Sequence, residues 1–209
     1  MVSPSVRLIV GLGNPGKKFS RTRHNVGERW LRDLAQRFQI SLEESARFKG
    51  EIGRGSMLGH DIRLLFPLTY MNASGESVGP FASYYKIAPA EILIVYDEVA
   101  FELGTCRIKL GGGDNGHNGV KSVMSALGNR KDFARLRIGV GHPGNAAEMV
   151  SYLTKLTMST DEIESMASSS KMNDTLLEYV LIGDWEKAMT LFHSLKEDIK
   201  RSVGSGSGI

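Results

Sequence analysis

The stretch "VGLGNPGKKFSRTRHN", residues 10–25, follows a short apolar run and decides how the fold of this sequence is interpreted. Its residues 11–16 form a G-x-G-x-x-G pattern, which is typical of dinucleotide-binding turns. In such a turn the glycines lead directly into a helix, and the pyrophosphate sits on the helix N-terminus. Here Pro15 and residues 17–23 intervene before any helical pattern begins. We therefore expect the glycines to form a tight turn at the end of a strand.

Length and composition are those of a single globular domain. The chain has 209 residues, of which 41% are hydrophobic, and we assign residues 1–203 to one domain and residues 204–209 to a flexible Gly/Ser tail. The net charge is only +3, so a polyanionic partner would have to bind at a local basic patch. The single cysteine, Cys106, fits a reducing compartment, and neither a secretory signal nor a membrane-length apolar run is evident. These features predict a cytoplasmic protein that does not associate with membranes.

Short apolar runs alternate with helical patterns along the chain. The runs are rich in Ile, Val and Leu and end in Gly, Pro or Asp, as buried strands of a parallel sheet do. They are Leu8–Val10, Ile62–Phe66, Ile92–Tyr96 and Leu136–Val140, and a fifth run, Cys106–Leu110, alternates apolar and basic residues. This alternation predicts an α/β fold: a single, mostly parallel, twisted sheet with helices on both faces and a helical C-terminal region.

The helical patterns carry recognisable start and stop signals. Asn25 and Glu28 have the spacing of a capping box, and an apolar stripe follows them. The stripe consists of Val26, Trp30, Leu31, Leu34 and Phe38. A second helix is expected over residues 81–87, with Pro80 in its first turn or at a kink, and a third over residues 120–127, with Asn118 as a possible cap. Two more are expected in the C-terminal region: one starts at Ser159 and ends at Gly183-Asp184, and the other follows it.

Polar side chains follow each predicted strand of the parallel group. Asn14 and His24 follow the first strand, Met71-Asn72 the second and His142 the fourth, while Asp97 ends the third. In open α/β sheets, ligands bind outside the carboxyl ends of the strands. We therefore expect these groups to gather on one rim of the sheet.

His24 and Asp97 are the candidates for acid–base chemistry. His24 immediately precedes a predicted helix, whose positive end disfavours an imidazolium, so we expect a neutral ring that can accept a proton near pH 7. Asp97 could accept a hydrogen bond from the other ring nitrogen and fix the tautomer. By spacing alone, an ordinary surface or capping histidine remains the plainer interpretation of His24.

A glycine-rich segment and a basic cluster lie close together in the sequence. Residues 111–119 contain five glycines, which would permit close approach to a ligand or the movement of a lid. The neighbouring basic residues could form a solvated face or a track for phosphate groups. They are Arg107, Lys109, Lys121, Arg130, Lys131, Arg135 and Arg137.

Two other kinds of site are poorly supported. The five histidines have no metal-ligand spacing, so we expect no metal and no cofactor. A serine nucleophile would need a G-x-S-x-G elbow, and the sequence has none.

Taken together, these segments closely resemble the bacterial peptidyl-tRNA hydrolase family. The matching pieces are L-I-V-G-L-G-N-P-G, T-R-H-N, P-L-T-Y-M-N-A-S-G, I-L-I-V-Y-D-E, K-L-G-G-G-D-N-G-H-N-G and R-L-R-I-G-V-G-H-P-G, in the family's order. The resemblance covers residues 7–144, whereas the C-terminal fifty residues match only in helical character.

The resemblance implies a monomeric, metal-free esterase that cleaves peptide from tRNA. By motif, His24 and Asp97 correspond to the catalytic pair, and Asn72 to a residue of the same centre. Substrate-binding positions correspond to Asn14, Phe19, Met71, Asn72, His117 and Asn118. Positions that contact tRNA correspond to Arg107, Lys109, Lys121 and Arg137.

Departures from the family pattern leave these residues in place. Phe19 stands where relatives often have Tyr, Ala100 and Glu102 replace an Asp and a Pro, and Asn115 replaces a Gly in the glycine-rich segment. An RNA-binding relative without hydrolase activity is the alternative to an enzyme, and the presence of His24 and Asp97 argues against it.

Overall fold

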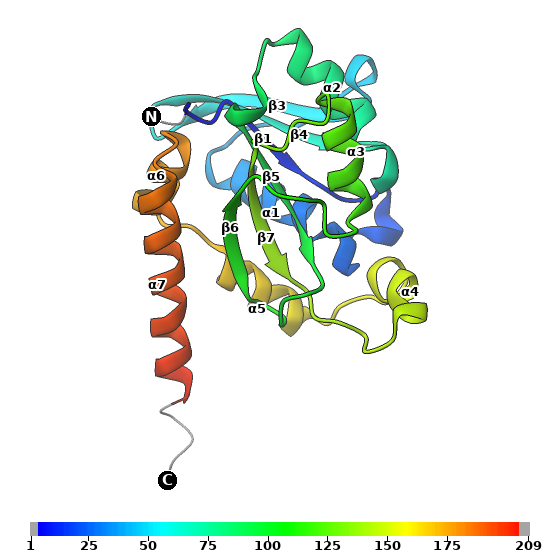
Figure 1. Cartoon of the computed structure of the whole chain (residues 1–209), viewed down its shortest axis with the longest axis vertical. Coiled ribbons are helices and arrows are strands. Elements are labelled where there is room, and N and C mark those ends of the chain that lie inside the picture. Colours follow the sequence, from blue (N-terminus) through cyan, green and yellow to red (C-terminus); the bar gives the residue numbers. More distant parts are fainter. Residues whose placement is uncertain (1–3, 205–209) are drawn as a thin grey trace.

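A seven-stranded sheet forms the centre of the molecule (Figure 1). The computed structural model describes residues 4–204, with side chains described to residue 194. The strand order is β2-β3-β4-β1-β5-β7-β6. The strands are β1 (Leu8–Gly11), β2 (Glu43–Ser45), β3 (Gly50–Met57), β4 (His60–Pro67), β5 (Ile92–Glu98), β6 (Cys106–Leu110) and β7 (Ala134–Gly139).

The sheet is mixed, with a parallel centre and antiparallel edges. Strands β4, β1, β5 and β7 run parallel, whereas β3 and β2 continue from β4 in antiparallel fashion and β6 pairs antiparallel with β7. All five predicted strands are therefore confirmed, but β2 and β3 were not predicted. Strand β3 carries glycine and polar residues in place of an apolar run, and Ile40 packs against its Gly53 and Gly55.

Helices cover both faces of the sheet, as predicted. The central strands alternate between two cores: Ile9 and Val95 point into one, while Val10 and Ile94 point into the other. The first core packs against α1 (Val26–Arg37) and the C-terminal helices. The second core packs against α2 (Gly75–Tyr84) and α3 (Asn118–Ala126), which lie on the opposite face in Figure 1.

Two glycines bring α1 close to the sheet. A Cβ on Gly27 would collide with the backbone of Leu12 and Val95, and one on Gly11 would collide with Gly27 itself. The glycine of the opening motif therefore serves helix–strand packing and the strand-end turn.

The structure corrects one predicted helix start and two predicted caps. Asn25 precedes α1 but makes no capping bond, because its side chain is bonded to Asn14 and Glu28. Helix α2 begins at Gly75, where the absence of a side chain lets it approach Ser122 of α3, and Pro80 lies in its interior. The cap of α3 is His117, not Asn118, which is the first residue of the helix.

The C-terminal region is helical, with more helices than predicted. It contains α4 (Met149–Thr154), α5 (Thr160–Ser170), α6 (Asp174–Leu181) and α7 (Trp185–Gly204). The predicted start at Ser159 is confirmed by a capping box with Glu162, but Asn173 caps a new helix before Gly183 is reached. Of the predicted tail, Gly204 ends α7 and residues 205–209 lie outside the described residues. In the part of the chain that is described, no helix is long and apolar enough to cross a membrane.

Candidate active site

The carboxyl ends of the parallel strands meet on one rim of the sheet. Asn14 follows β1, Met71 follows β4 in a short 3₁₀ turn, η4 (Met71–Ala73), and Asp97 is the penultimate residue of β5. His24 lies in another 3₁₀ turn, η2 (Arg23–Asn25), immediately before α1. The predicted gathering of these groups is therefore observed for the first three strands.

A buried histidine–aspartate pair is the centre of the site. Nδ1 of His24 lies 2.9 Å from Oδ1 and 3.0 Å from Oδ2 of Asp97. Asp97 is 2% exposed and His24 8% exposed, so their contact is almost wholly shielded from water. Since a carboxylate accepts, Nδ1–H of His24 donates, and the lone pair of a neutral ring is left on Nε2.

A second histidine shares the same carboxylate. Nε2 of His117 lies 3.0 Å from Oδ1 of Asp97, and its Nδ1 accepts a hydrogen bond of 3.2 Å from the Val120 N–H at the start of α3. The backbone donor fixes Nδ1 as the acceptor, so a neutral His117 carries its proton on Nε2 and donates to Asp97. The sequence had placed His117 only on the cleft wall.

Opposing effects set the pKa values of this group. Burial lowers the pKa of His24, but the charge of Asp97 and its hydrogen bond outweigh burial and raise the pKa above the usual 6.5. Burial by itself raises the pKa of Asp97, and the two imidazoles lower it well below its usual range. We expected the helix terminus to keep His24 neutral, but the pKa of His24 is raised, because of Asp97.

Hydrogen bonds of Asn25 hold the turn after β1 in place beside the His24–Asp97 pair. Asn25 Oδ1 accepts from the backbone N–H of Asn14 at 3.0 Å, and Asn25 Nδ2 donates to the carbonyl of Asn14 at 2.8 Å. The side chain of Asn14 in turn accepts from the backbone N–H of Met71 at 2.8 Å. Sequence reasoning missed this role of Asn25, although the residue stands in the T-R-H-N motif.

The two exposed asparagines lie in an adjoining groove. Asn72 and Asn118 line it together with Lys121, and it runs from η4 and the first turn of α2 along α3 to Ala126. Both amides are exposed to solvent and free to meet a ligand. Nearby, Phe19 packs edge-on against the exposed ring of Tyr70, with ring centroids 6.5 Å apart.

Some residues of the basic cluster are exposed, whereas others are buried or already paired with a carboxylate. Arg107 and Lys109 of β6 are exposed. Arg137 is paired through Nε and Nη2 with the buried carboxylate of Glu98, at 2.9 and 2.6 Å. Arg135 is only 1% exposed, so it is not part of the surface track in which the sequence placed it.

His142 remains apart from the histidine pair in the contacts that the structure gives. Its Nδ1 accepts from the backbone N–H of Gly144 at 2.9 Å within its own loop. His142 follows the carboxyl end of β7, which is parallel to β5 and ends on the same rim, but it bonds within its own loop instead of to the pair.

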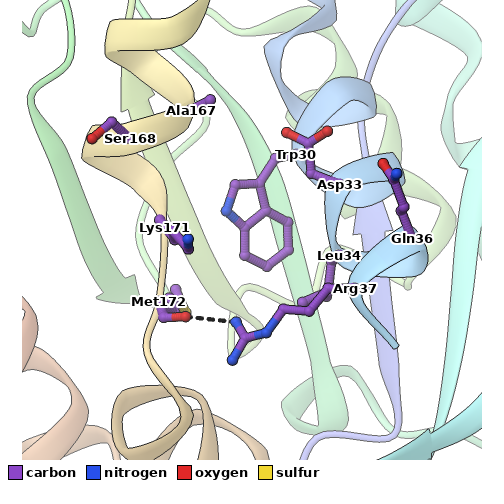
Figure 2. Close-up of a pocket in the computed structure, with 9 residues that line it drawn as sticks. All are labelled: Trp30, Asp33, Leu34, Gln36, Arg37, Ala167, Ser168, Lys171 and Met172. Carbon is purple, nitrogen blue, oxygen red and sulfur yellow. Dashed lines mark hydrogen bonds between the residues drawn. The ribbon is translucent and has the colours of Figure 1, made fainter. Parts of the chain in front are cut away.

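A separate pocket lies between α1 and α5 (Figure 2). Trp30 forms its floor and donates from Nε1 to the carbonyl of Ser170 at 3.1 Å, while Arg37 donates to that of Met172 at 2.6 Å. None of the predicted site residues lines this pocket. Its polar groups join α1 to the segment after α5, so its contacts are structural.

The two histidines and Asp97 lie close enough together either to form hydrogen bonds with one another or to bind a metal ion. Ligand atoms of His24, Asp97 and His117 all lie within 4.8 Å of one another. The ring nitrogens nearest Asp97 are, however, already engaged by its carboxylate, and the ring of His117 is anchored to α3. Directed N–H donors account for every one of these contacts.

A buried imidazole–carboxylate pair at the carboxyl ends of parallel strands, beside exposed amides, defines an α/β protein with a site of the hydrolase class. The chain belongs to the peptidyl-tRNA hydrolase family: the family model described as peptidyl-tRNA hydrolase matches residues 8–201.

Individual relatives agree with that assignment. The chain is 44% identical over 189 residues to a peptidyl-tRNA hydrolase of Teredinibacter turnerae, covering 90% of this chain and 97% of that protein. It is 52% identical over 149 residues to one of Actinobacillus succinogenes, covering 71% and 76%. A crystal structure of peptidyl-tRNA hydrolase from Acinetobacter baumannii superposes with a TM-score of 0.84 at 40% identity, covering 90% of this chain and 94% of that one.

Proposed function

We propose that this chain hydrolyses the ester between peptide and tRNA in peptidyl-tRNA, with His24 activating the attacking water. The contact between Nδ1 of His24 and Asp97 carries this proposal. It directs the Nε2 lone pair away from the carboxylate, where water can reach it. General-base assistance of this kind contributes about 10² to 10⁴ in rate.

Asp97 orients the base and stabilises the imidazolium that forms when His24 takes the proton. His117 donates to the same carboxylate and limits its rotation. The ester is an activated acyl group, so direct attack by water is sufficient, and the reaction as proposed uses neither a covalent enzyme intermediate nor a metal or other cofactor. The proton on His24 then passes to the departing ribose oxygen.

In this proposal the asparagines bind the acyl–adenosine end of the substrate. Asn72 donates to the developing oxyanion, a contribution of roughly 10² to 10³ in rate. Asn14 has its Oδ1 engaged by Met71, which leaves its amide N–H₂ to donate to a peptide carbonyl. Asn118 binds the neighbouring peptide group, and Met71, Phe19 and His117 form the walls.

In this proposal, cations on β6, α3 and β7 bind the tRNA backbone. Arg107 and Lys109 on β6, Lys121 on α3 and Arg137 on β7 supply charge beside the glycine-rich segment. Arg137 is already neutralised by Glu98, so we assign the larger share of phosphate binding to Arg107 and Lys109. Backbone contacts carry no base sequence information, which suits an enzyme that acts on many tRNAs.

The same arrangement favours substrates whose amino group is blocked. An α-ammonium would lose water in the cleft without gaining an anionic partner, because Asp97 is covered by two histidines. N-blocked aminoacyl-tRNA is then hydrolysed much faster than free aminoacyl-tRNA. We further propose that the protein acts as a monomer in the cytoplasm, for which the lone Cys106 and the family resemblance are the support.

The deciding experiment is His24→Ala, assayed for hydrolysis of N-blocked aminoacyl-tRNA and, separately, for tRNA binding. Turnover should fall by at least about 10² while binding is retained. Unchanged turnover would contradict the assignment of His24 as the base, and loss of binding alone would move its role to recognition.

A further inference from the structure

Arg135 is a buried cation on the strand next to one edge of the sheet. It lies on β7, between β5 and β6, and is 1% exposed. Arginine is almost never so buried unless its charge is paired. Here no carboxylate is found among the acceptors that the described chain offers it.

The shortest polar contacts of Arg135 are with two backbone carbonyls of the glycine-rich loop, and its Nη2 also lies 3.8 Å from Sδ of Met124 on α3. Nη1 donates to the carbonyl of Gly113 at 2.5 Å, and Nη2 donates to that of Gly112 at 2.6 Å. The guanidinium also lies 4.6 Å from the ring centroid of Phe133. The planar fork of arginine thus engages two consecutive peptide groups at once.

The loop needs such a support because its own backbone is permissive. It spans residues 111–117, between the end of β6 and the start of α3, and four of its residues have positive φ. These are Gly111, Gly112, Asn115 and Gly116. Glycine backbones lose the most conformational entropy on ordering, so an unsupported loop of this composition would sample many shapes.

The loop ends at the residue that contacts Asp97. The backbone N–H of His117 donates to the carbonyl of Asp114 at 2.9 Å, and Asp114 directly follows the clamped Gly113. Nε2 of His117 then reaches Oδ1 of Asp97 at 3.0 Å. We propose that Arg135 is a positioning residue, whose buried guanidinium fixes the glycine-rich loop so that His117 is held on Asp97. This role in catalysis rests on the proposed function, whereas the clamp itself does not.

Arg135→Met tests the clamp. Methionine fills much of the same space without a buried charge, so the fold should persist, as it often does when buried ionic groups are replaced by apolar ones. Exchange of the loop amides in the free protein should then accelerate, by roughly 10- to 100-fold for each charged hydrogen bond that is removed. Arg135→Lys, which keeps the charge but lacks the fork, should give an intermediate result and remains informative if the methionine variant does not fold.

Arg63→Met is the matched control. Arg63 is another strand arginine that stacks 4.6 Å from an aromatic ring, that of Tyr85, but it lies on β4 and does not contact the loop. In Arg63→Met, the amides of the glycine-rich loop should exchange at the same rate as in the parent protein. Loop exchange that is unchanged in Arg135→Met, or equally fast in Arg63→Met, would overturn the clamp.

A double-mutant cycle tests the route to the active site. Arg135→Met should lower kcat/KM by roughly 10- to 100-fold, since small misplacements at a reacting centre cost this much. In a His117→Ala background the same change should cost little more, because the residue through which Arg135 acts is already gone. Additive losses would refute the positioning role. Absence of hydrolysis by the parent protein would contradict the proposed function and leave the exchange result standing.

Discussion

Nδ1 of His24 and Oδ1 of Asp97 are 2.9 Å apart although 73 positions separate the two residues in the chain. The pair predicts the pH dependence of hydrolysis. The base form of His24 exists above its pKa, and that pKa is raised above 6.5, so kcat/KM should increase with pH through a value above 6.5. In Asp97→Asn only the lowering effect of burial remains, so the inflection should move below 6.5. The pH profile of kcat/KM for both proteins measures this.

The neutral amide of the Asp97→Asn variant cannot orient the ring as a carboxylate does, so its plateau rate should also fall, by about 10² to 10⁴. Asp61→Asn is the control, because Asp61 is an exposed carboxylate on β4 that is paired with Arg54 of β3 and does not contact His24. Its profile should match that of the parent. An inflection that stays in place in Asp97→Asn would assign the titrating group to a residue other than His24.

Folding stability should respond to the same pair. Because the pKa of His24 is raised in the folded protein, its contribution is fully present below the unfolded pKa of about 6.5 and is lost as pH rises through the folded pKa. The free energy of unfolding of the parent should therefore decline across this interval. His24→Gln cannot titrate and should lack that decline. Urea melts of both proteins between about pH 6 and pH 9 compare the two slopes.

The lowered pKa of Asp97 affects folding stability at acid pH, where the free energy of unfolding should decrease as the pH falls. Its contribution is present above the usual carboxyl pKa of 3.8 and is lost as pH falls through the folded pKa. Identical slopes for the parent and His24→Gln above pH 6.5 would show that the His24 proton is not coupled to folding.

Local apolar patterns predicted the central sheet, whereas the histidine–aspartate pair was predicted from the convergence of strand ends and from the family resemblance. Apolar strands and the residues at their ends are local signals, and parallel strands bring those ends to one rim. Strand β3 was not predicted because its glycines pack against Ile40, in the segment between α1 and β2, which a local apolar pattern does not reveal. Arg135 was grouped with surface cations because charge alone does not reveal burial beneath a loop. His117 likewise meets Asp97 only through the tertiary fold.

The salt dependence of tRNA binding should become weaker when Arg107 is replaced. Replacing Arg107 with Gln should weaken binding and reduce the slope of log K against log salt by about one for each phosphate that the guanidinium neutralises. Arg54→Gln is the control, since Arg54 is also exposed but lies on β3, towards the other end of the sheet. Titrations at several salt concentrations measure both slopes. Equal slopes in all three proteins would exclude Arg107 from phosphate binding.

Gly27 should be among the least tolerant positions for stability. A Cβ at this position would collide with the backbone carbonyls of Val95 and Leu12, which belong to the sheet and its strand-end turn and cannot move aside as a flexible side chain could. Gly27→Ala should therefore destabilise by about 3 kcal/mol, at the upper end of overpacking effects. Gly113→Ala provides the comparison, because a Cβ there meets nothing within 4 Å. Its stability should change by less than about 0.5 kcal/mol. Chemical denaturation of both variants decides the point, and equal stabilities would mean that α1 can shift away from the sheet at little cost.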